Sequence, residues 1–514
     1  MKKQYIILSL ILLAMISFFS CDESTIELDP IGDTDVTFFQ NEKQMTQAVM
    51  GMYQKVAFFY NFRNNQNTYL QAIWMLPGDD LTTEGDHAYE KFVSLNGSNG
   101  PLSDFYNYSY QMIARANVVL HKIEENGAFA YKVDPLLKNH HKGEAYFFRG
   151  WMNFILWNTY GTAPIVNKWI TNIEDAYPGN SKDTELLDQA LADLDSAARL
   201  LPATWNAANK GRVTQNSAHA LRGKVFVFRG TVNKTQSDFT SAITEFNAIS
   251  GASLMPNYGD NFNYTKEYNA ESFMEYSANE AAGGTNNNAA LNNDQFAVVG
   301  DISAWYGCFT QKPTWIGTAV VSATQSLIDS YETGDPRMIY TFVANPTGAM
   351  QKNIVKYIRD GMVTNNKASS DQSKNNPRML RYADVLLLKA EAIVRSGGSL
   401  SEAIGLVNQI RTRARKSTLT GVEAAVPANL NTAETDAAVV LDWVYQERRR
   451  ELACEDGHRW YDLRRRHIAG EIDLKTWNFN SKKTDLVFKD YNVNFPLPEL
   501  EVIDNPNLDQ NTGY

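Results

Sequence analysis

The stretch Glu447-Arg448-Arg449-Arg450-Glu451-Leu452, followed at once by Glu455-Asp456-Gly457-His458-Arg459-Trp460-Tyr461-Asp462-Leu463-Arg464-Arg465-Arg466, sets opposed charges beside apolar residues. On a helix, Glu447 and Glu451 lie one turn apart, so Arg448 can pair locally with a carboxylate. Gly457 permits the backbone to leave the helix. We expect burial of Leu452, Trp460, Tyr461 and Leu463, with guanidinium groups forked onto carboxylates or carbonyl oxygens. The stretch is therefore either a catalytic centre or a structural clasp.

Further motifs lie on both sides of this stretch. Upstream stands Arg381-Tyr382-Ala383-Asp384-Val385-Leu386-Leu387-Leu388-Lys389-Ala390-Glu391-Ala392; downstream stand Phe495-Pro496-Leu497-Pro498 and Asn505-Pro506-Asn507-Leu508-Asp509-Gln510-Asn511-Thr512-Gly513-Tyr514. They resemble the RYAEVLLMYAEA helix and the closing FPIP and NPNLxQNPGY motifs of the SusD/RagB family, the surface lipoproteins of Bacteroidetes nutrient-uptake systems. Several separated motifs occur in the family's order, so the resemblance covers nearly the whole chain.

Helical periodicity dominates the body of the chain. In Thr184 to Leu201, leucines and alanines recur every three or four residues and form one apolar face, which Pro202 ends. Gly397-Gly398 makes a turn between two such segments, as in a tetratricopeptide unit. Four pairs can be drawn: Glu42–Phe58 with Phe105–Glu125, Lys138–Tyr160 with Thr184–Leu201, Thr214–Phe228 with Asp238–Ile249, and Tyr382–Arg395 with Ser401–Ala414. The predicted fold is mainly α, a right-handed superhelix of stacked pairs.

Long irregular segments interrupt this scaffold. The chain has 514 residues, 44% of them hydrophobic, which suffices for a large core. Insertions are expected around residues 61–104 and 251–378, both rich in Gly, Asn and Asp, and loops of this length are usually functional or disordered. We expect one SusD-like domain over residues 21–514, with the C-terminal signature in residues 380–514.

The first twenty residues are predicted to be a lipoprotein signal. Lys2 and Lys3 precede an apolar stretch from Tyr5 to Phe19, and Cys21 follows. An ordinary secretory signal or a membrane anchor is the alternative interpretation. Asp22 and Glu23 resemble the acidic cue that sends Bacteroidetes lipoproteins to the cell surface. We therefore expect lipidation of Cys21, a location at the outer membrane facing outward, and membrane contact through the lipid anchor only.

The composition of the insertions favours sugar recognition. A pyranose stacks its C–H face on an aromatic ring and offers hydroxyls to Asn, Asp, Gln and Arg. By resemblance, family members that bind glycans use aromatic residues from these two regions. The candidate ligand-binding residues are Trp74, Asp80, Tyr89, Asn96, Trp305, Tyr306 and Trp315, with Tyr69, Asp79 and Asp86 nearby. For each aromatic residue, packing in the core is the alternative.

Other ligands are less well supported by the sequence. Asp79-Asp80 with Glu84, Asp86 and His87 could gather around a cation, but their spacing matches no EF-hand loop, so we expect no metal and no cofactor. The net charge of −10 argues against a nucleic-acid partner. Cys454, placed on the charged helix, is predicted to be a small buried thiol.

The function that these observations favour is capture without catalysis. Glu447, Glu451, His458 and Asp462 could serve general acid–base chemistry, but the neighbouring arginines should lower the carboxyl pKa values and tie them into ion pairs. The resemblance implies a glycan-binding lipoprotein that delivers oligosaccharide or polysaccharide to a TonB-dependent transporter of the SusC kind. Peptide capture, as in the RagB branch, and a helical-repeat scaffold that binds only proteins are the alternatives.

Overall fold

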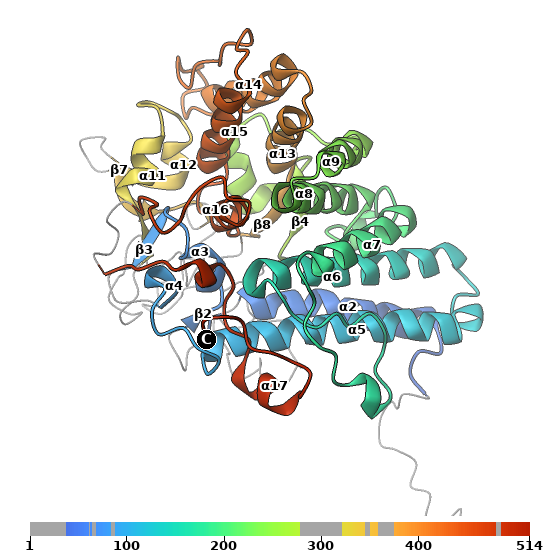
Figure 1. The fold of residues 1–514 in the computed structure, drawn as a ribbon. Helices are drawn as coiled ribbons and strands as arrows, with labels where there is room; N and C mark the ends of the chain where they lie inside the picture. Colours follow the sequence, from blue (N-terminus) through green and yellow to red (C-terminus); the bar gives the residue numbers. More distant parts are fainter. Residues whose placement is uncertain are drawn as a thin grey trace, which may run out of the picture.

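The computed structural model describes residues 37–60, 62–63, 68–83, 88–277, 321–344, 350–357, 375–479 and 485–514. Helices dominate this part of the chain, and they are stacked side by side across the molecule (Figure 1). Cys21 and the proposed signal lie outside the described residues. Within the described residues, no helix is long and apolar enough to cross a membrane.

The four predicted helix pairs are confirmed. Their helices are α2 (Glu42–Tyr60) with α5 (Gly100–Ala130), α6 (Pro135–Tyr160) with α7 (Glu185–Leu200), α8 (Gln215–Asn233) with α9 (Gln236–Ala248), and α13 (Tyr382–Arg395) with α14 (Leu400–Lys416). Each pair packs on the next, α5 against α6, α7 against α8 and α9 against α13, which gives the superhelical stack in Figure 1. The predicted helix at Phe105 begins earlier, because Asn99 caps the backbone at Leu102 and Pro101 fits the first turn.

Glycines set the distance between partner helices. On α6, Gly143 and Gly150 lie two turns apart, and a Cβ atom there would be 2.9 Å from Leu201 and 3.0 Å from Leu194. On α8, a Cβ atom at Gly223 would be 2.3 Å from the ring of Phe246. The absence of a side chain therefore lets α7 and α9 approach closely. The same seven-residue spacing separates Gly223 from Gly230 on α8. This glycine spacing is a sequence signal for close helix pairing, in addition to the apolar periodicity.

The remaining elements are short or belong to the C-terminal region. The helices are α3 (Ala72–Met75), α4 (Ala88–Lys91), α11 (Gln325–Ser330), α12 (Met338–Thr341), α15 (Ala437–Glu451), α16 (His458–Ile468) and α17 (Glu499–Asp504). Four two-stranded antiparallel ladders join β1 (Phe62–Arg63) to β2 (Thr68–Tyr69), β3 (Leu81–Thr83) to β5 (Val321–Ala323), β4 (Ser272–Glu275) to β8 (Arg378–Arg381), and β6 (Phe342–Ala344) to β7 (Met350–Ile354). The two predicted insertions thus contain regular structure.

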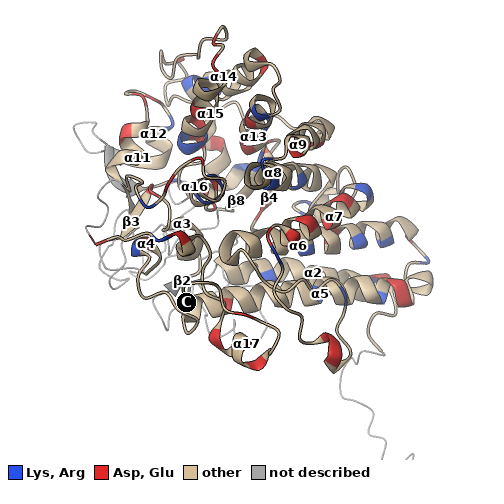
Figure 2. Ribbon diagram, in the orientation of Figure 1, with Lys and Arg blue, Asp and Glu red and all other residues tan. Residues whose placement is uncertain are grey.

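Two hydrophobic clusters form the described core. The larger one runs through the first three helix pairs and the C-terminal segment, and the smaller one lies between α13, α14 and α15. Basic and acidic residues are interspersed along α13, α15 and α16 (Figure 2). Several of these charged residues are buried. The C-terminal signature therefore brings charged side chains into the interior of the protein.

Candidate functional site

A short β-ladder joins the two insertions. Strand β3 comes from the first insertion and pairs with β5 from the second, with Leu81 opposite Ala323 and Thr83 opposite Val321. Thr324 extends the contact, because its backbone N–H donates to the Asp80 carbonyl at 2.8 Å and its hydroxyl donates to the Asp79 carbonyl at 2.8 Å. Segments more than two hundred residues apart in sequence therefore lie side by side.

Two arginines of the C-terminal signature hold the first insertion. Arg459 donates to both carboxylate oxygens of Asp79 at 2.7 and 2.8 Å, and Trp477 Nε1 donates to the same carboxylate at 3.2 Å. Arg449 donates to Asp80 at 2.7 Å. Burial disfavours ionisation of Asp79, but the charge and hydrogen bonds of Arg459 outweigh it and lower the pKa of Asp79. The backbone next to β3 is thus fixed to α15 and α16 by ion pairs.

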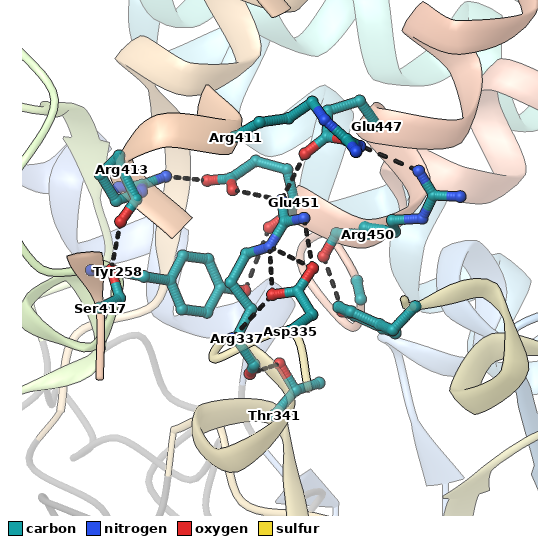
Figure 3. Close-up of polar contacts among 12 residues, drawn as sticks. Tyr258, Asp335, Arg337, Thr341, Arg411, Arg413, Ser417, Glu447, Arg450 and Glu451 are labelled. Carbon is teal, nitrogen blue, oxygen red and sulfur yellow. Dashed lines mark hydrogen bonds and ion pairs between the residues drawn. The ribbon is translucent and has the colours of Figure 1, made fainter. Parts of the chain in front are cut away.

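Carboxylates of the same signature hold the second insertion. Glu451 accepts hydrogen bonds from Arg337 at 3.1 Å and from Arg413 (Figure 3). It also accepts one from Arg381 at 2.6 Å. We call the surrounding buried set the Glu451 cluster; its acids are Glu271, Asp335, Glu447, Glu451 and Glu455, and its bases are Arg337, Lys356, Arg381, Arg411 and Arg413. Five acids face five bases, so the cluster can be buried without net charge.

A second buried cluster lies between α8, α13, α15 and α16. Arg448 donates to Asp384 at 2.7 Å and to Asp462 at 2.8 Å. Arg465 donates to Asp462 at 2.8 Å and to both oxygens of Glu391 at 2.6 and 2.7 Å. Most of these contacts cross from one element to another. The prediction that these charges pair is therefore confirmed. The prediction that Arg448 pairs with Glu447 or Glu451 on its own helix is wrong, because its partners Asp384 and Asp462 lie on other helices.

The protonation states in both clusters suit a structural clasp. Burial alone would raise the pKa of Glu451, but Arg413, Arg381 and Arg337 lower it to about 2. Arg448 and Arg465 likewise outweigh burial and lower the pKa of Asp462. Burial and the adjacent Lys224 lower the pKa of His458, so the neutral ring accepts a hydrogen bond from Lys224 at Nδ1, 3.0 Å away. Lowered carboxyl pKa values confirm the expectation for Glu451 and Asp462.

Asp456 behaves differently from its neighbours. It accepts a hydrogen bond from the Tyr60 hydroxyl at 2.5 Å, and burial raises the pKa of Asp456 to about 6. A carboxyl group whose pKa is raised on folding stabilises the folded state when protonated, so this contribution is lost as pH rises from the unfolded value of about 4 through 6.

We therefore expect Asp456→Asn to remove a pH-dependent loss of stability. From a pH of about 4 to a pH of about 7, the unmodified protein should lose about 2 kcal/mol of unfolding free energy that the variant does not lose. The difference in unfolding free energy between the two proteins should change by that amount. Urea unfolding of both proteins across this range measures the difference. A difference that stays constant with pH would show that Asp456 ionises normally in the folded protein.

Three predicted ligand-binding residues are instead part of the protein interior. Trp74 is 4% exposed and packs against Tyr60 and Phe105, with ring centroids 6.1 and 5.6 Å apart. It borders a cavity of about 40 Å³, well below the roughly 150 Å³ that holds a benzene ring. Tyr89 is buried and donates to Asn99 at 2.5 Å. The prediction that Trp74, Tyr89 and Asp80 contact the ligand is therefore wrong, because all three side chains are buried. The two aromatic residues pack in the core, and Asp80 is an anchor for Arg449.

The other predicted site residues are not brought together by the described structure. Asn96 is exposed and accepts a hydrogen bond from the Ser98 backbone at 3.0 Å. Trp305, Tyr306 and Trp315 lie outside the described residues, in the segment that precedes β5. Glu84, Asp86 and His87, which follow β3, also lie outside them. Among the described residues, no group of three or more His, Cys, Asp or Glu side chains is placed to hold a metal ion.

The prediction that Cys454 lies on the charged helix is wrong. Cys454 lies beyond the last residue of α15 rather than on the charged helix, with a φ of 61°. It is a buried thiol, as expected, and burial raises its pKa. Gly457 has a φ of 71° and caps the start of α16, whereas the backbone leaves α15 earlier than predicted, at Leu452.

Comparisons with known proteins agree with this architecture. Residues 231–514 match the model of the SusD family, and residues 27–227 match a family described as starch-binding and associating with the outer membrane. SusD-like protein P38 of Formosa agariphila is 28% identical over 430 residues, which cover 79% of this chain and 78% of that protein.

Solved structures show the same fold. A laminarin-binding SusD-like protein is 21% identical, with a TM-score of 0.69 over 92% of this chain and all of the other. Surface glycan-binding protein A from Bacteroides uniformis is 18% identical, with a TM-score of 0.70 over 92% of this chain and 99% of the other. Together with the sequence motifs and the family model over the C-terminal half, these matches establish that the chain belongs to the SusD family.

Proposed function

We propose that this protein captures oligosaccharide or polysaccharide at the cell surface and delivers it, without cleaving it, to a TonB-dependent outer-membrane transporter of the SusC kind. The observation that carries the proposal is the ladder between β3 and β5. It brings together on one scaffold the two insertions that, by resemblance, supply glycan contacts. Two structurally similar proteins, one described as laminarin-binding and the other as a surface glycan-binding protein, support a sugar as the ligand.

The remaining parts of the proposal concern location and chemistry. Lipidation of Cys21 would anchor the protein to the outer membrane, in agreement with the description of the family that matches residues 27–227. The acids of the C-terminal signature are bound to arginines inside the protein, which favours a clasp over a general acid. Incubation with the bound glycan followed by assay of reducing ends tests the absence of catalysis, and sustained turnover would overthrow it.

The ligand class can be tested directly with residues 22–514. This protein is titrated with an array of polysaccharides and peptides while tryptophan fluorescence is followed. Saturable binding to one glycan class with a change in fluorescence supports the proposal. Saturable binding to peptides alone would favour a RagB-like function, and binding to neither, with co-purification of a barrel, would favour a scaffold.

Trp305→Ala and Trp315→Ala are each expected to weaken glycan binding about tenfold. Alanine removes the flat indole surface on which the C–H face of the sugar would stack, and with it most of the contact area. Calorimetric titration with the glycan identified above measures the change. Trp169→Ala is the matched control, since Trp169 is half-buried, lies outside both insertions and contacts His121 and Lys122. Unchanged affinity of a variant would remove that tryptophan from the site.

A further inference from the structure

The turn between α5 and α6 presents apolar side chains to solvent. Phe129 is 39% exposed, Val133 is 89% exposed and Leu136 is 66% exposed. We call these three residues the α5–α6 tip; in Figure 1 the turn lies at the far right, where α5 ends and α6 begins. Leu136 is held in the first turn of α6, since the Asp134 carboxylate caps the backbone at Leu136 and Leu137. The tip is therefore a preformed apolar projection.

The start of the described chain is fastened to this tip. Glu42, at the beginning of α2, accepts hydrogen bonds from the backbone N–H groups of Val133 at 3.0 Å and Asp134 at 2.6 Å. Asn126, in the last turns of α5, donates to the Phe39 carbonyl at 3.5 Å. The described part of the chain consequently begins close to the tip. Fifteen residues, Asp22 to Val36, separate Cys21 from the described chain.

We propose that the α5–α6 tip contacts a lipid surface, inserting Phe129, Val133 and Leu136 into the interfacial region next to the acyl anchor. The inference rests on the lipid anchor of the proposed function. An anchor attached sixteen residues before Thr37 keeps the tip within about 55 Å of the membrane even when that segment is fully extended. The tether therefore gives the tip a high effective concentration at the membrane, so that insertion of a few side chains is enough for a lasting contact.

A lipid surface fits the tip better than a protein partner does. A stable protein interface buries about 800 Å² on each side, whereas the tip is a small projection flanked by the exposed Lys132 and Asp134. Shallow insertion needs only a few apolar side chains, and stable membrane attachment commonly combines a lipid chain with a second contact. The tip would thereby supply that second contact and restrict how the protein is oriented on the membrane.

The test uses a reporter at the tip of tethered protein. Residues 22–514 carry an amino-terminal histidine tag, which holds the chain on phosphatidylcholine vesicles containing a nickel-chelating lipid in place of the acyl anchor. All proteins carry Cys308→Ser, and Cys454 is buried. An environment-sensitive dye is attached through Val133→Cys. On tethering, its fluorescence is expected to rise several-fold and to be quenched by a lipid-borne quencher.

The matched control is Val422→Cys. Val422 is 72% exposed and lies between α14 and α15. These two helices are at the top of Figure 1, away from the tip at the right. A dye attached through Val422→Cys should not respond to the vesicles. A second variant, Val133→Asp with Leu136→Asp, changes only exposed side chains and should abolish the response of a dye attached through Phe129→Cys.

The outcomes separate this inference from the proposed function. No rise at the Val133 position, an equal rise at both positions, or a rise that requires an added barrel protein would each overturn the lipid contact. Glycan titration of the Val133→Asp, Leu136→Asp protein in solution is performed in parallel and is expected to match that of the unmodified protein. Failure of glycan binding with a retained vesicle response would reject the proposed ligand and leave the lipid contact standing.

Discussion

Glu451→Gln is expected to lower the unfolding free energy by about 3–5 kcal/mol, the usual cost of removing one partner from a buried ion pair. Glu451 accepts hydrogen bonds from Arg337, Arg381 and Arg413, and all three guanidinium groups are buried. The glutamine side chain has the same shape, but it supplies no negative charge. The three guanidinium groups would then share the remaining carboxylates of the Glu451 cluster.

Chemical denaturation measures this effect, with Glu423→Gln as the matched control. Glu423 also pairs with an arginine, Arg415, but its side chain is 47% exposed, so its replacement should cost less than about 1 kcal/mol. Equal stabilities of the two variants would show that the Glu451 cluster does not hold the fold. Because the cluster joins residues of the second insertion to α15, the unfolding of that insertion should be the first change observed in Glu451→Gln.

Gly457→Ala is expected to destabilise the protein by about 2–5 kcal/mol, through backbone strain and overpacking together. The φ of 71° is unfavourable for alanine, and the new Cβ atom would lie 2.6 Å from Trp74 Cδ1 and 2.7 Å from the Trp74 carbonyl oxygen. The carbonyl belongs to the backbone of α3, so it cannot move away without shifting that helix. Thermal and urea unfolding measure the loss.

Gly470→Ala isolates the contribution of the contact. Gly470 has a φ of 72°, and a Cβ atom added there would meet no neighbouring atom within 4 Å, so its replacement should cost only the backbone strain of about 1–2 kcal/mol. The excess loss in Gly457→Ala then measures the packing of α3 beneath α16. Equal losses in the two variants would contradict the close contact with Trp74.

The helical scaffold could be predicted because its information is local. Leucine and alanine spacing in α7, the Gly397-Gly398 turn and the proline after α7 each act within a few residues of the chain. The burial of Leu452, Trp460, Tyr461 and Leu463 followed from the same reasoning and is confirmed. Local periodicity and turn chemistry therefore sufficed for the order and pairing of the long helices.

The site was harder to predict because its contacts are remote in sequence. Charge alternation showed that Glu451 would pair, but its partners Arg337 and Arg413 lie 114 and 38 residues away, and no local pattern selects them. Trp74 and Tyr89 were misassigned because the polar composition of their insertion does not reveal that α3 packs against α16 and that Tyr89 packs against Phe495. The candidates Trp305, Tyr306 and Trp315 stay predictions.

The ladder between β3 and β5 has a consequence for how this protein can diverge. The segment 84–87 runs from Thr83 at the end of β3 to Ala88 at the start of α4, and the segment 278–320 follows β4 closely and ends at Val321, the start of β5. The buried ion pairs described above are formed by residues outside these two segments, so changes within them leave those pairs in place. Selection could therefore exchange these segments as modules and retarget the protein to a new polymer while the helices that carry them are inherited unchanged.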